Sequence, residues 1–140
     1  MPNTEPKPLQ VAVGVIENAQ EHILITLRHA HLHQGGLWEF PGGKINPDET
    51  SEQCIIREIS EELTISIEVL SQLLPIEFDY GKKQIRLIPF VCKIISGEIN
   101  LTEHVAQKWI YVEEWPTIDW SGADHELILK NQESLKLLLL

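Results

Sequence analysis

The middle of the chain carries four charged side chains within six residues: Arg57, Glu58, Glu61 and Glu62. Apolar residues recur around them at spacings of three and four, which is the period of an α-helix. On a helix surface, like charges at these spacings destabilise the chain by roughly 0.2–0.5 kcal/mol per pair. The segment therefore predicts a helix from residue 51 that buries one flank and presents carboxylates, in need of a cation, on the neighbouring flank.

Thr50 and Gln53 mark the start of this helix, because Ser or Thr followed three residues later by Glu or Gln is typical of a capping box. A rotation of about 100° per residue then defines the flank that faces the core. The predicted core flank is formed by Ile55, Ile56, Ile59 and Leu63. The carboxylate flank suits a hard divalent cation such as Mg²⁺, which commonly accompanies phosphate substrates. Without further evidence, it would equally suit an ordinary solvated face with an Arg–Glu pair.

The spacing within residues 42–65 resembles the Nudix box of nucleoside-diphosphate-linked hydrolases. Gly43 is followed after five residues by Glu49, and after seven more by Arg57 and the glutamates up to Glu62. The segment at residues 11–16, the sequence WEFP at residues 38–41, and a glutamate six residues before Trp109 look like the MutT branch of this family. The resemblance covers residues 9–132, which is nearly the whole chain.

Thr64 departs from the family pattern, which has glycine two residues after the last box glutamate. Glycine suits the left-handed residue that ends a helix, whereas a β-branched residue is strained there. Either Thr64 adopts this conformation at a cost of roughly 1 kcal/mol, or the helix ends in another way. No metal ligand is lost, so we expect a local effect on stability.

The resemblance implies roles for the acidic residues. The metal ligands would be the backbone carbonyl of Gly42 and the carboxylates of Glu58, Glu61, Glu62 and Glu103. The catalytic group would comprise these four glutamates together with Arg57 and Glu49, the last two pairing to hold the helix against the preceding loop. Phosphoryl transfer needs charge neutralisation and an aligned water, which carboxylate-bound metal supplies. Mg²⁺ is the expected metal, with Mn²⁺ as the alternative.

Four further positions match residues near the nucleotide in the MutT branch: Arg28, Phe40, Tyr80 and Asp124. Phe40 could instead belong to the core, and Tyr80 could instead pack a hairpin. Asp124 falls where MutT proteins that bind oxidised guanine have Asn. A carboxylate only accepts hydrogen bonds unless it is protonated, so Asp124 would suit the exocyclic amine of cytosine. It could also accept the additional ring N–H of an 8-oxo purine.

These features lead us to expect Mg²⁺-dependent hydrolysis of a nucleoside triphosphate to a monophosphate and pyrophosphate. The first expectation is MutT-like removal of 8-oxo-dGTP, and the alternative is a pyrophosphohydrolase for CTP or a modified cytosine triphosphate. An alternative from another functional class is a non-catalytic nucleotide-binding module. It is disfavoured because the box carboxylates and Arg57 are all present.

Composition limits the partners. The chain has 140 residues and a formal net charge of −10 with only 11 Lys and Arg, which argues against binding to polymeric nucleic acid. No segment is long enough to span a membrane. Cys54 and Cys92 give no disulfide framework and suggest buried thiols in a reducing, cytoplasmic environment. We expect a flexible lead at residues 1–7, a single domain at residues 8–140, and a monomer or weak homodimer.

The remaining pattern predicts an α/β/α sandwich with a mixed sheet, the architecture that the resemblance also implies. The expected strands are residues 10–16, 22–27, 65–74, 75–78, 84–95 and 109–112, with a second helix at 125–138. Residues 39–40 would lead into a glycine-rich turn, residues 80–82 would form a hairpin turn, and Pro89 would place its strand at an edge or bulge.

The loop at residues 29–37 contains His29, His31 and His33. Alternating histidines would align their rings only on a strand, and the glycines that follow favour a loop. We therefore expect a polar lid over the substrate rather than a zinc or nickel site.

Overall fold

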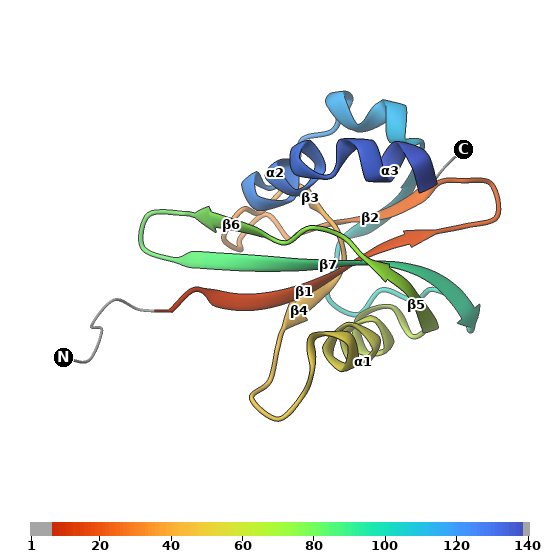
Figure 1. Cartoon of the computed structure of the whole chain (residues 1–140), viewed down its shortest axis with the longest axis horizontal. Coiled ribbons are helices and arrows are strands. Elements are labelled where there is room, and N and C mark those ends of the chain that lie inside the picture. The colour runs from red at the N-terminus through yellow and green to blue at the C-terminus, as the bar shows by residue number, and fades with distance from the viewer. Residues whose placement is uncertain (1–6, 139–140) are drawn as a thin grey trace.

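A mixed sheet lies between two helical layers in the computed structural model, which describes residues 7–138 (Figure 1). The strands are β1 (Leu9–Glu17), β2 (Ile23–Leu27), β3 (Trp38–Glu39), β4 (Gly42–Lys44), β5 (Ser66–Gln72), β6 (Ile76–Asp79), β7 (Gln84–Ser96) and β8 (Ala106–Ile110). The helices are α1 (Ser51–Leu63), the 3₁₀ helix η1 (Val112–Thr117), α2 (Gly122–Lys130) and α3 (Gln132–Leu138). Helix α1 covers one face of the sheet, and α2 and α3 cover the other. The predicted α/β/α sandwich is confirmed; most of the expected N-terminal lead lies outside the described residues.

The long strands β1 and β7 form the centre of the sheet. They pair in parallel from Leu9 opposite Ile85 to Glu17 opposite Lys93, while the other pairings are antiparallel. The main path of the sheet runs β3-β2-β1-β7-β5. Strand β1 pairs with β4 through its first half and meets β2 only at Glu17, so the sheet opens between β4 and β2.

Pro89 was predicted to lie at an edge or a bulge. It lies in the central strand β7, so the edge is wrong, and the residue occupies an interruption of the ladder instead. On the side away from β1, β5 ends with Gln72 opposite Phe90, and β6 begins with Ile76 opposite Leu87. Pro89 occupies the interruption between these two partners, where its carbonyl accepts a hydrogen bond from the Leu73 N–H at 2.9 Å. A residue without an N–H is tolerated here because the ladder is already broken on this side.

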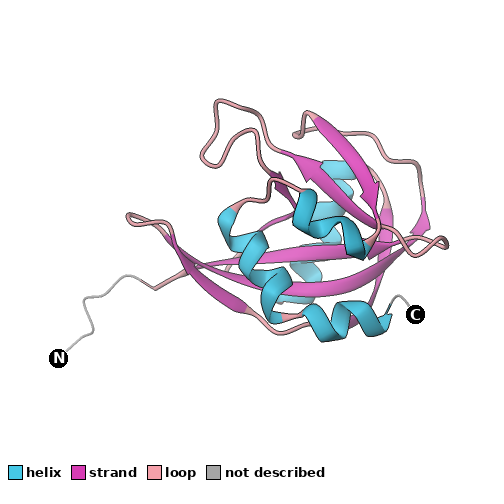
Figure 2. Ribbon diagram, turned by 90° about the horizontal axis from the view of Figure 1, so that it is seen from above, coloured by secondary structure: helices cyan, strands magenta, loops and turns pink. Residues whose placement is uncertain are grey.

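Two apolar cores fill the spaces between the sheet and the helices. The core beside α1 contains Ile16, Leu24, Ile55, Ile59, Leu63 and both cysteines. The core beside α2 and α3 contains Val13, Val15, Ile25, Phe40, Leu127 and Leu135. Alternate residues of β1 enter different cores, as expected for a strand covered on both faces. Figure 2 shows the helices lying across the sheet in the view from above.

Several element boundaries differ from the prediction. The two glycines after residue 41 form strand β4 rather than a turn. Strand β8 ends at Ile110. The predicted second helix begins three residues earlier, at Gly122, and breaks at Asn131, whose side chain bonds both the N–H and the carbonyl of Leu74 at 2.8 and 3.0 Å. The hairpin turn at residues 80–82 is confirmed, with Gly81 at φ +94°.

Both cysteines are buried and free, as predicted, and burial is the main cause that raises the pKa of each thiol to about 12. Within residues 7–138, no helix is long and apolar enough to cross a membrane.

Candidate active site

Helix α1 begins where the capping box predicts. The Thr50 hydroxyl accepts a hydrogen bond from the Gln53 N–H at 3.0 Å, and the Gln53 side chain accepts one from the Thr50 N–H at 2.9 Å. Ile55, Ile59 and Leu63 are fully buried, as predicted. Ile56 is 42% exposed, so its place on the core flank is wrong. The buried side of the helix is displaced away from Ile56, because Cys54 and Glu62 on the other side of Ile55 are buried as well.

Arg57 ties the helix to the loop before it. Its guanidinium donates to both carboxylate oxygens of Glu49, at 2.6 and 3.0 Å, and to the Lys44 carbonyl at 3.2 Å. The same group reaches Glu58 at 2.9 Å and Glu61 at 3.1 Å. The Arg57 hydrogen bonds lower the pKa of Glu49 to about 2, with help from the Asn46 N–H, and they raise the pKa of Arg57 itself. The arrangement matches the predicted supporting pair.

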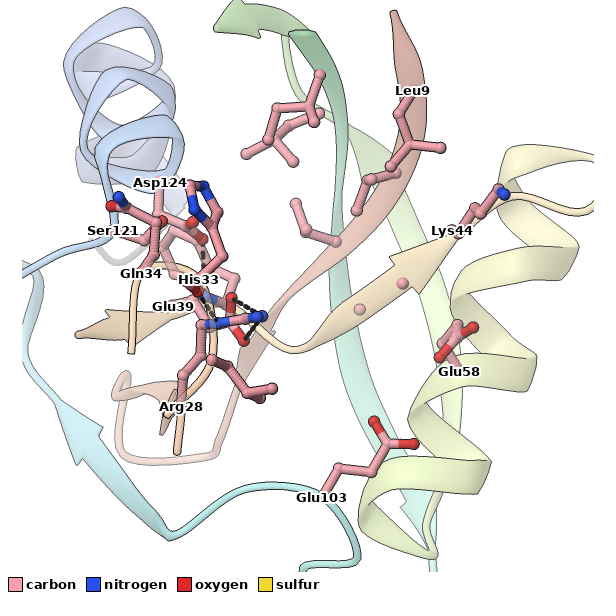
Figure 3. A pocket seen from close by; sticks show the side chains of 18 of the residues that line it. Leu9, Arg28, His33, Gln34, Glu39, Lys44, Glu58, Glu103, Ser121 and Asp124 are labelled. Carbon is pink, nitrogen blue, oxygen red and sulfur yellow. Dashed lines mark hydrogen bonds and ion pairs between the residues drawn. The ribbon is translucent and has the colours of Figure 1, made fainter. Parts of the chain in front are cut away.

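Glu58, Glu62 and Glu103 line one end of a cavity of about 530 Å³. In Figure 3 the Glu103 side chain points toward α1, and Glu58 projects from α1 into the same space. The Glu62 side chain is buried, and its Oε2 has no hydrogen-bond partner among the described residues. Desolvation, followed by repulsion from Glu103, Glu58 and Glu39, raises the pKa of Glu62 to about 9.

The two glycines of β4 form the wall opposite α1. A Cβ at Gly43 would lie 2.5 and 2.6 Å from the two oxygens of the Glu58 carboxylate. Any residue other than glycine would therefore displace this carboxylate from its present position. Gly42 also lines the cavity, and a Cβ there would collide with the backbone of β1. Glu61 lies apart from this group: it does not line the cavity, its side chain is 57% exposed, and it pairs with Arg57.

The acidic end fits a hard divalent cation. A buried carboxylate oxygen without a donor, surrounded by further carboxylates, is stabilised by a metal ion or a proton. Among the described residues, no group of three His, Cys, Asp or Glu side chains is already arranged to hold a metal ion. Side-chain rotation within the cavity, starting with the Glu58 oxygen that now contacts Arg57, would therefore accompany binding.

The other end of the cavity contains the four residues predicted to contact a nucleotide. Arg28, Phe40, Tyr80 and Asp124 all line it. The Phe40 ring is buried against Trp120, with ring centroids 5.2 Å apart, so it belongs to the core as well. The Tyr80 hydroxyl lies 2.9 Å from the Ser121 hydroxyl. It also accepts a hydrogen bond from the Ala123 N–H at 2.9 Å, and so fixes the first turn of α2.

Asp124 is buried at the start of α2 and joins two distant segments. Its Oδ1 accepts a hydrogen bond from the Phe40 N–H at 2.9 Å. Burial is the main cause that raises the pKa of this carboxyl group, and the charge of Glu39 adds to it. A protonated Asp124 has one donor and one acceptor, as an amide does. Only in that protonated form does Asp124 resemble Asn.

Glu39 and His104 are cavity residues that the sequence analysis did not assign. Glu39 accepts hydrogen bonds from Arg28 Nη1 at 3.3 and 3.4 Å, and its Oε1 lies 3.0 Å from His104 Nε2. Glu39 stands between the two ends of the cavity, since its charge raises the pKa of both Glu62 and Asp124. A glutamate flanked by Trp and Phe on a short strand is the sequence signal that points to it.

The histidine loop contributes to the cavity in part. Leu32, His33 and Gln34 line it, and the His33 ring stacks edge-on against Tyr80 with centroids 4.8 Å apart. His29 and His31 are exposed. The position of His33 and Gln34 beside the start of α2 is visible in Figure 3 and agrees with a polar lid.

Thr64 ends α1 in the left-handed conformation, at φ +61° and ψ +30°. The first of the two predicted alternatives is therefore confirmed. Its N–H donates to the Ser60 carbonyl at 3.1 Å, and its hydroxyl donates to the Glu98 carbonyl at 2.9 Å. A glycine would adopt the same backbone without strain but would lack the second bond.

A protein-family model described as the NUDIX domain matches residues 12–130. An 8-oxo-dGTP diphosphatase of Escherichia coli K12 is 34% identical over 124 residues, which are 89% of this chain and 96% of that protein. An 8-oxo-dGTP diphosphatase of Proteus vulgaris is 37% identical over 94 residues, covering 67% and 84% of the two chains. A CTP pyrophosphohydrolase of E. coli K12 is 34% identical over 122 residues, covering 87% and 90%.

Solved structures show the same fold. The solution structure of the E. coli ORF135 protein has a TM-score of 0.81 and 30% identity, and the match covers 99% of this chain and 97% of that one. A MutT protein from Methanosarcina mazei Go1 has a TM-score of 0.84 at 23% identity, covering 95% and 99%, which supports the fold alone.

Proposed function

The chain belongs to the NUDIX domain family, and from this premise we propose that it hydrolyses a nucleoside triphosphate to a monophosphate and pyrophosphate. The family resemblance and the prediction of a Nudix pyrophosphohydrolase are confirmed by the family match and the named relatives. One observation carries the proposed reaction. A single cavity has carboxylates at one end and Arg28 and Asp124 at the other, so a phosphate chain and a base can be bound together.

Mg²⁺ is the metal that we propose, with Mn²⁺ as the alternative, held by Glu58, Glu62, Glu103 and the Gly42 carbonyl. Bound metal would neutralise phosphate charge and lower the pKa of an attacking water. Arg57 orients Glu58 from outside the cavity. We place Glu49 and Glu61 in supporting roles, because both pair with Arg57 and neither lines the cavity.

For the base, we propose 8-oxo-dGTP first, on the strength of the relatives that carry this name. CTP or a modified cytosine triphosphate is the second candidate, supported by the CTP pyrophosphohydrolase relative and by Asp124 as an acceptor. Oδ1 of Asp124 is engaged by the Phe40 N–H. We therefore assign base recognition to Oδ2, which accepts from cytosine when ionised and can donate to a purine carbonyl when protonated.

The experiment is a pyrophosphate-release screen with normal, oxidised and methylated nucleoside triphosphates in Mg²⁺. Glu58→Gln should lower kcat about a hundredfold or more, because it removes a proposed metal ligand. Glu52→Gln is the matched control, since Glu52 lies on the first turn of the same helix outside the cavity. Full Mg²⁺-dependent release by Glu58→Gln would refute the site.

The same screen tests the base and the non-catalytic alternative. Asp124→Asn should shift preference away from cytosine triphosphates and toward oxidised guanine, and an unchanged preference would count against Asp124 as the reading residue. Binding of nucleotide by the wild-type chain with no turnover in Mg²⁺ or Mn²⁺ would support a binding module instead. The net charge of −10 supports a free nucleotide rather than polymeric nucleic acid as substrate. We propose a cytoplasmic monomer or weak homodimer.

A further inference from the structure

Glu103 lies on an irregular connection between β7 and β8 rather than on a helix or strand. The residue is exposed, yet its side chain is directed at the acidic end of the cavity, where its charge acts on Glu62 (Figure 3). An irregular connection does not by itself fix a side chain in one place, so contacts made by the neighbouring residues decide where Glu103 lies. Something in the fold must hold Glu103 in place.

Thr102, the residue before Glu103, is bound to the end of α1. Its N–H donates to the Glu62 carbonyl at 3.1 Å. Its hydroxyl lies 2.9 Å from the Glu61 carbonyl and 3.2 Å from the Glu62 carbonyl. Carbonyls in the last turn of a helix have no partner within the helix, so this loop caps them. The cap joins Thr102 to the helix that carries Glu58 and Glu62.

His104, the residue after Glu103, is bound on the other side. Its Nε2 lies 3.0 Å from Glu39 Oε1, and its side chain is only 7% exposed. Glu39 is held in turn by Arg28. The other ring nitrogen of His104, Nδ1, is buried without a partner among the described residues. The contact with Glu39 is therefore the one that fixes the His104 ring.

We propose that Thr102 and His104 are positioning residues that hold Glu103 over Glu58 and Glu62 for metal binding, one from α1 and the other from Glu39. This inference rests on the proposed function, because it assumes a metal at these carboxylates. Anchors on both neighbours remove most of the backbone freedom of Glu103 before the metal arrives. They also connect the metal end of the cavity with the Glu39–Arg28 pair at the nucleotide end.

The first test is Thr102→Val, which keeps the shape of the side chain and removes the hydroxyl. Mn²⁺ affinity, measured by calorimetric titration without nucleotide, should fall about tenfold. Amide exchange at residues 100–105 should become faster. Thr102→Ser should restore both values because it restores the hydroxyl. Thr117→Val is the matched control: the Thr117 hydroxyl also donates to a helix carbonyl, at 2.6 Å, but Thr117 does not line the cavity.

The second test separates the two nitrogens of His104. The amide nitrogen of His104→Gln can take the place of Nε2 beside Glu39, whereas the shorter His104→Asn mimics only the Nδ1 side. We expect Gln to keep most of the Mn²⁺ affinity and Asn to lose it about tenfold. Equal effects of the two variants, or an unchanged affinity in both His104→Asn and Thr102→Val, would overturn the proposal. Thermal unfolding of each variant identifies any variant that fails to fold. If the variants of one anchor fail to fold, the Mn²⁺ affinity of the variants of the other anchor tests the proposal.

Glu103→Gln and Glu58→Gln distinguish failure of this inference from failure of the proposed function. If Glu58→Gln loses Mn²⁺ and Glu103→Gln binds it as the wild type does, the proposed function stands and the positioning proposal is overturned. If neither variant changes Mn²⁺ binding, the metal site of the proposed function is wrong, and the positioning proposal falls with it. Loss of affinity in both variants, with the expected anchor effects, supports both.

Discussion

Metal binding should expel a proton from Glu62. Burial and the neighbouring carboxylates raise the pKa of this group to about 9 in the folded protein, from an unperturbed 4.5. At pH 7.5 this shift leaves the Glu62 carboxyl group mostly protonated. A carboxylate ligand must be deprotonated to bind a metal. Each Mn²⁺ or Mg²⁺ bound should therefore release about one proton.

The sign of the pH dependence follows from the same shift. Below about pH 9 the metal competes with the proton, so affinity should rise roughly tenfold per pH unit from pH 6.5 to 8.5 and level off above 9. In the metal-free protein, the contribution of Glu62 to stability is fully present below pH 4.5 and is lost as pH rises toward 9. Metal should therefore stabilise the fold most at alkaline pH.

Calorimetric titration of Mn²⁺ in buffers of different ionisation enthalpy, such as PIPES and Tris at one pH, measures the number of protons released. Glu62→Gln removes the titrating group and one metal ligand, so Mn²⁺ should bind more weakly and each ion that still binds should release almost no proton. Glu52→Gln, outside the cavity, should keep the wild-type count. Tight Mn²⁺ binding with no proton release and no change of affinity across this pH range would show that Glu62 is ionised in the free protein, and the reasoning from burial would be refuted.

Three further predictions test the fold around the site. Thr64→Ala keeps the left-handed strain and loses the hydroxyl bond, so urea unfolding should show a loss of about 1 kcal/mol, whereas Thr64→Gly should stay within about 1 kcal/mol of the wild type. Asp124→Asn should stabilise the protein increasingly as pH rises above 4, because burial raises the pKa of Asp124 and the wild type loses stability there; thermal unfolding at pH 5 and 8 checks this, and a constant difference would contradict it. Tyr80→Phe should cost about 1–2 kcal/mol by leaving the first turn of α2 without its acceptor, while the exposed Tyr111→Phe should change urea unfolding little.

Local patterns accounted for the part of the site on α1. The Thr50–Gln53 pair predicts the start of the helix, and the period of residues 51–63 predicts the buried Ile55, Ile59 and Leu63 and the carboxylate flank. Ile56 was misplaced because the position of the buried side round the helix depends on what packs against it. That contact is made by the sheet, which a helical period does not describe.

The errors in the strands have a similar origin. Pro89 predicted a sheet edge or a bulge, but two successive strands share one side of β7 and leave a gap at that residue. The second helix was predicted as continuous because its sequence has no Pro or Gly at the break. The Asn131 side chain interrupts it by bonding Leu74, which is 57 residues away in the chain.

The sequence by itself determined that Glu58 and Glu62 share one flank of a helix that begins after Thr50, and the Nudix resemblance added the expectation that Arg57 pairs with Glu49. Backbone hydrogen bonds and side-chain period act over a few residues, so the sequence displays them directly. Only the tertiary structure decided that Glu39 and His104 join the cavity and that burial alters the acidity of Glu62 and Asp124. Proximity across the fold and removal from water arise from packing between distant segments, and no local pattern encodes them.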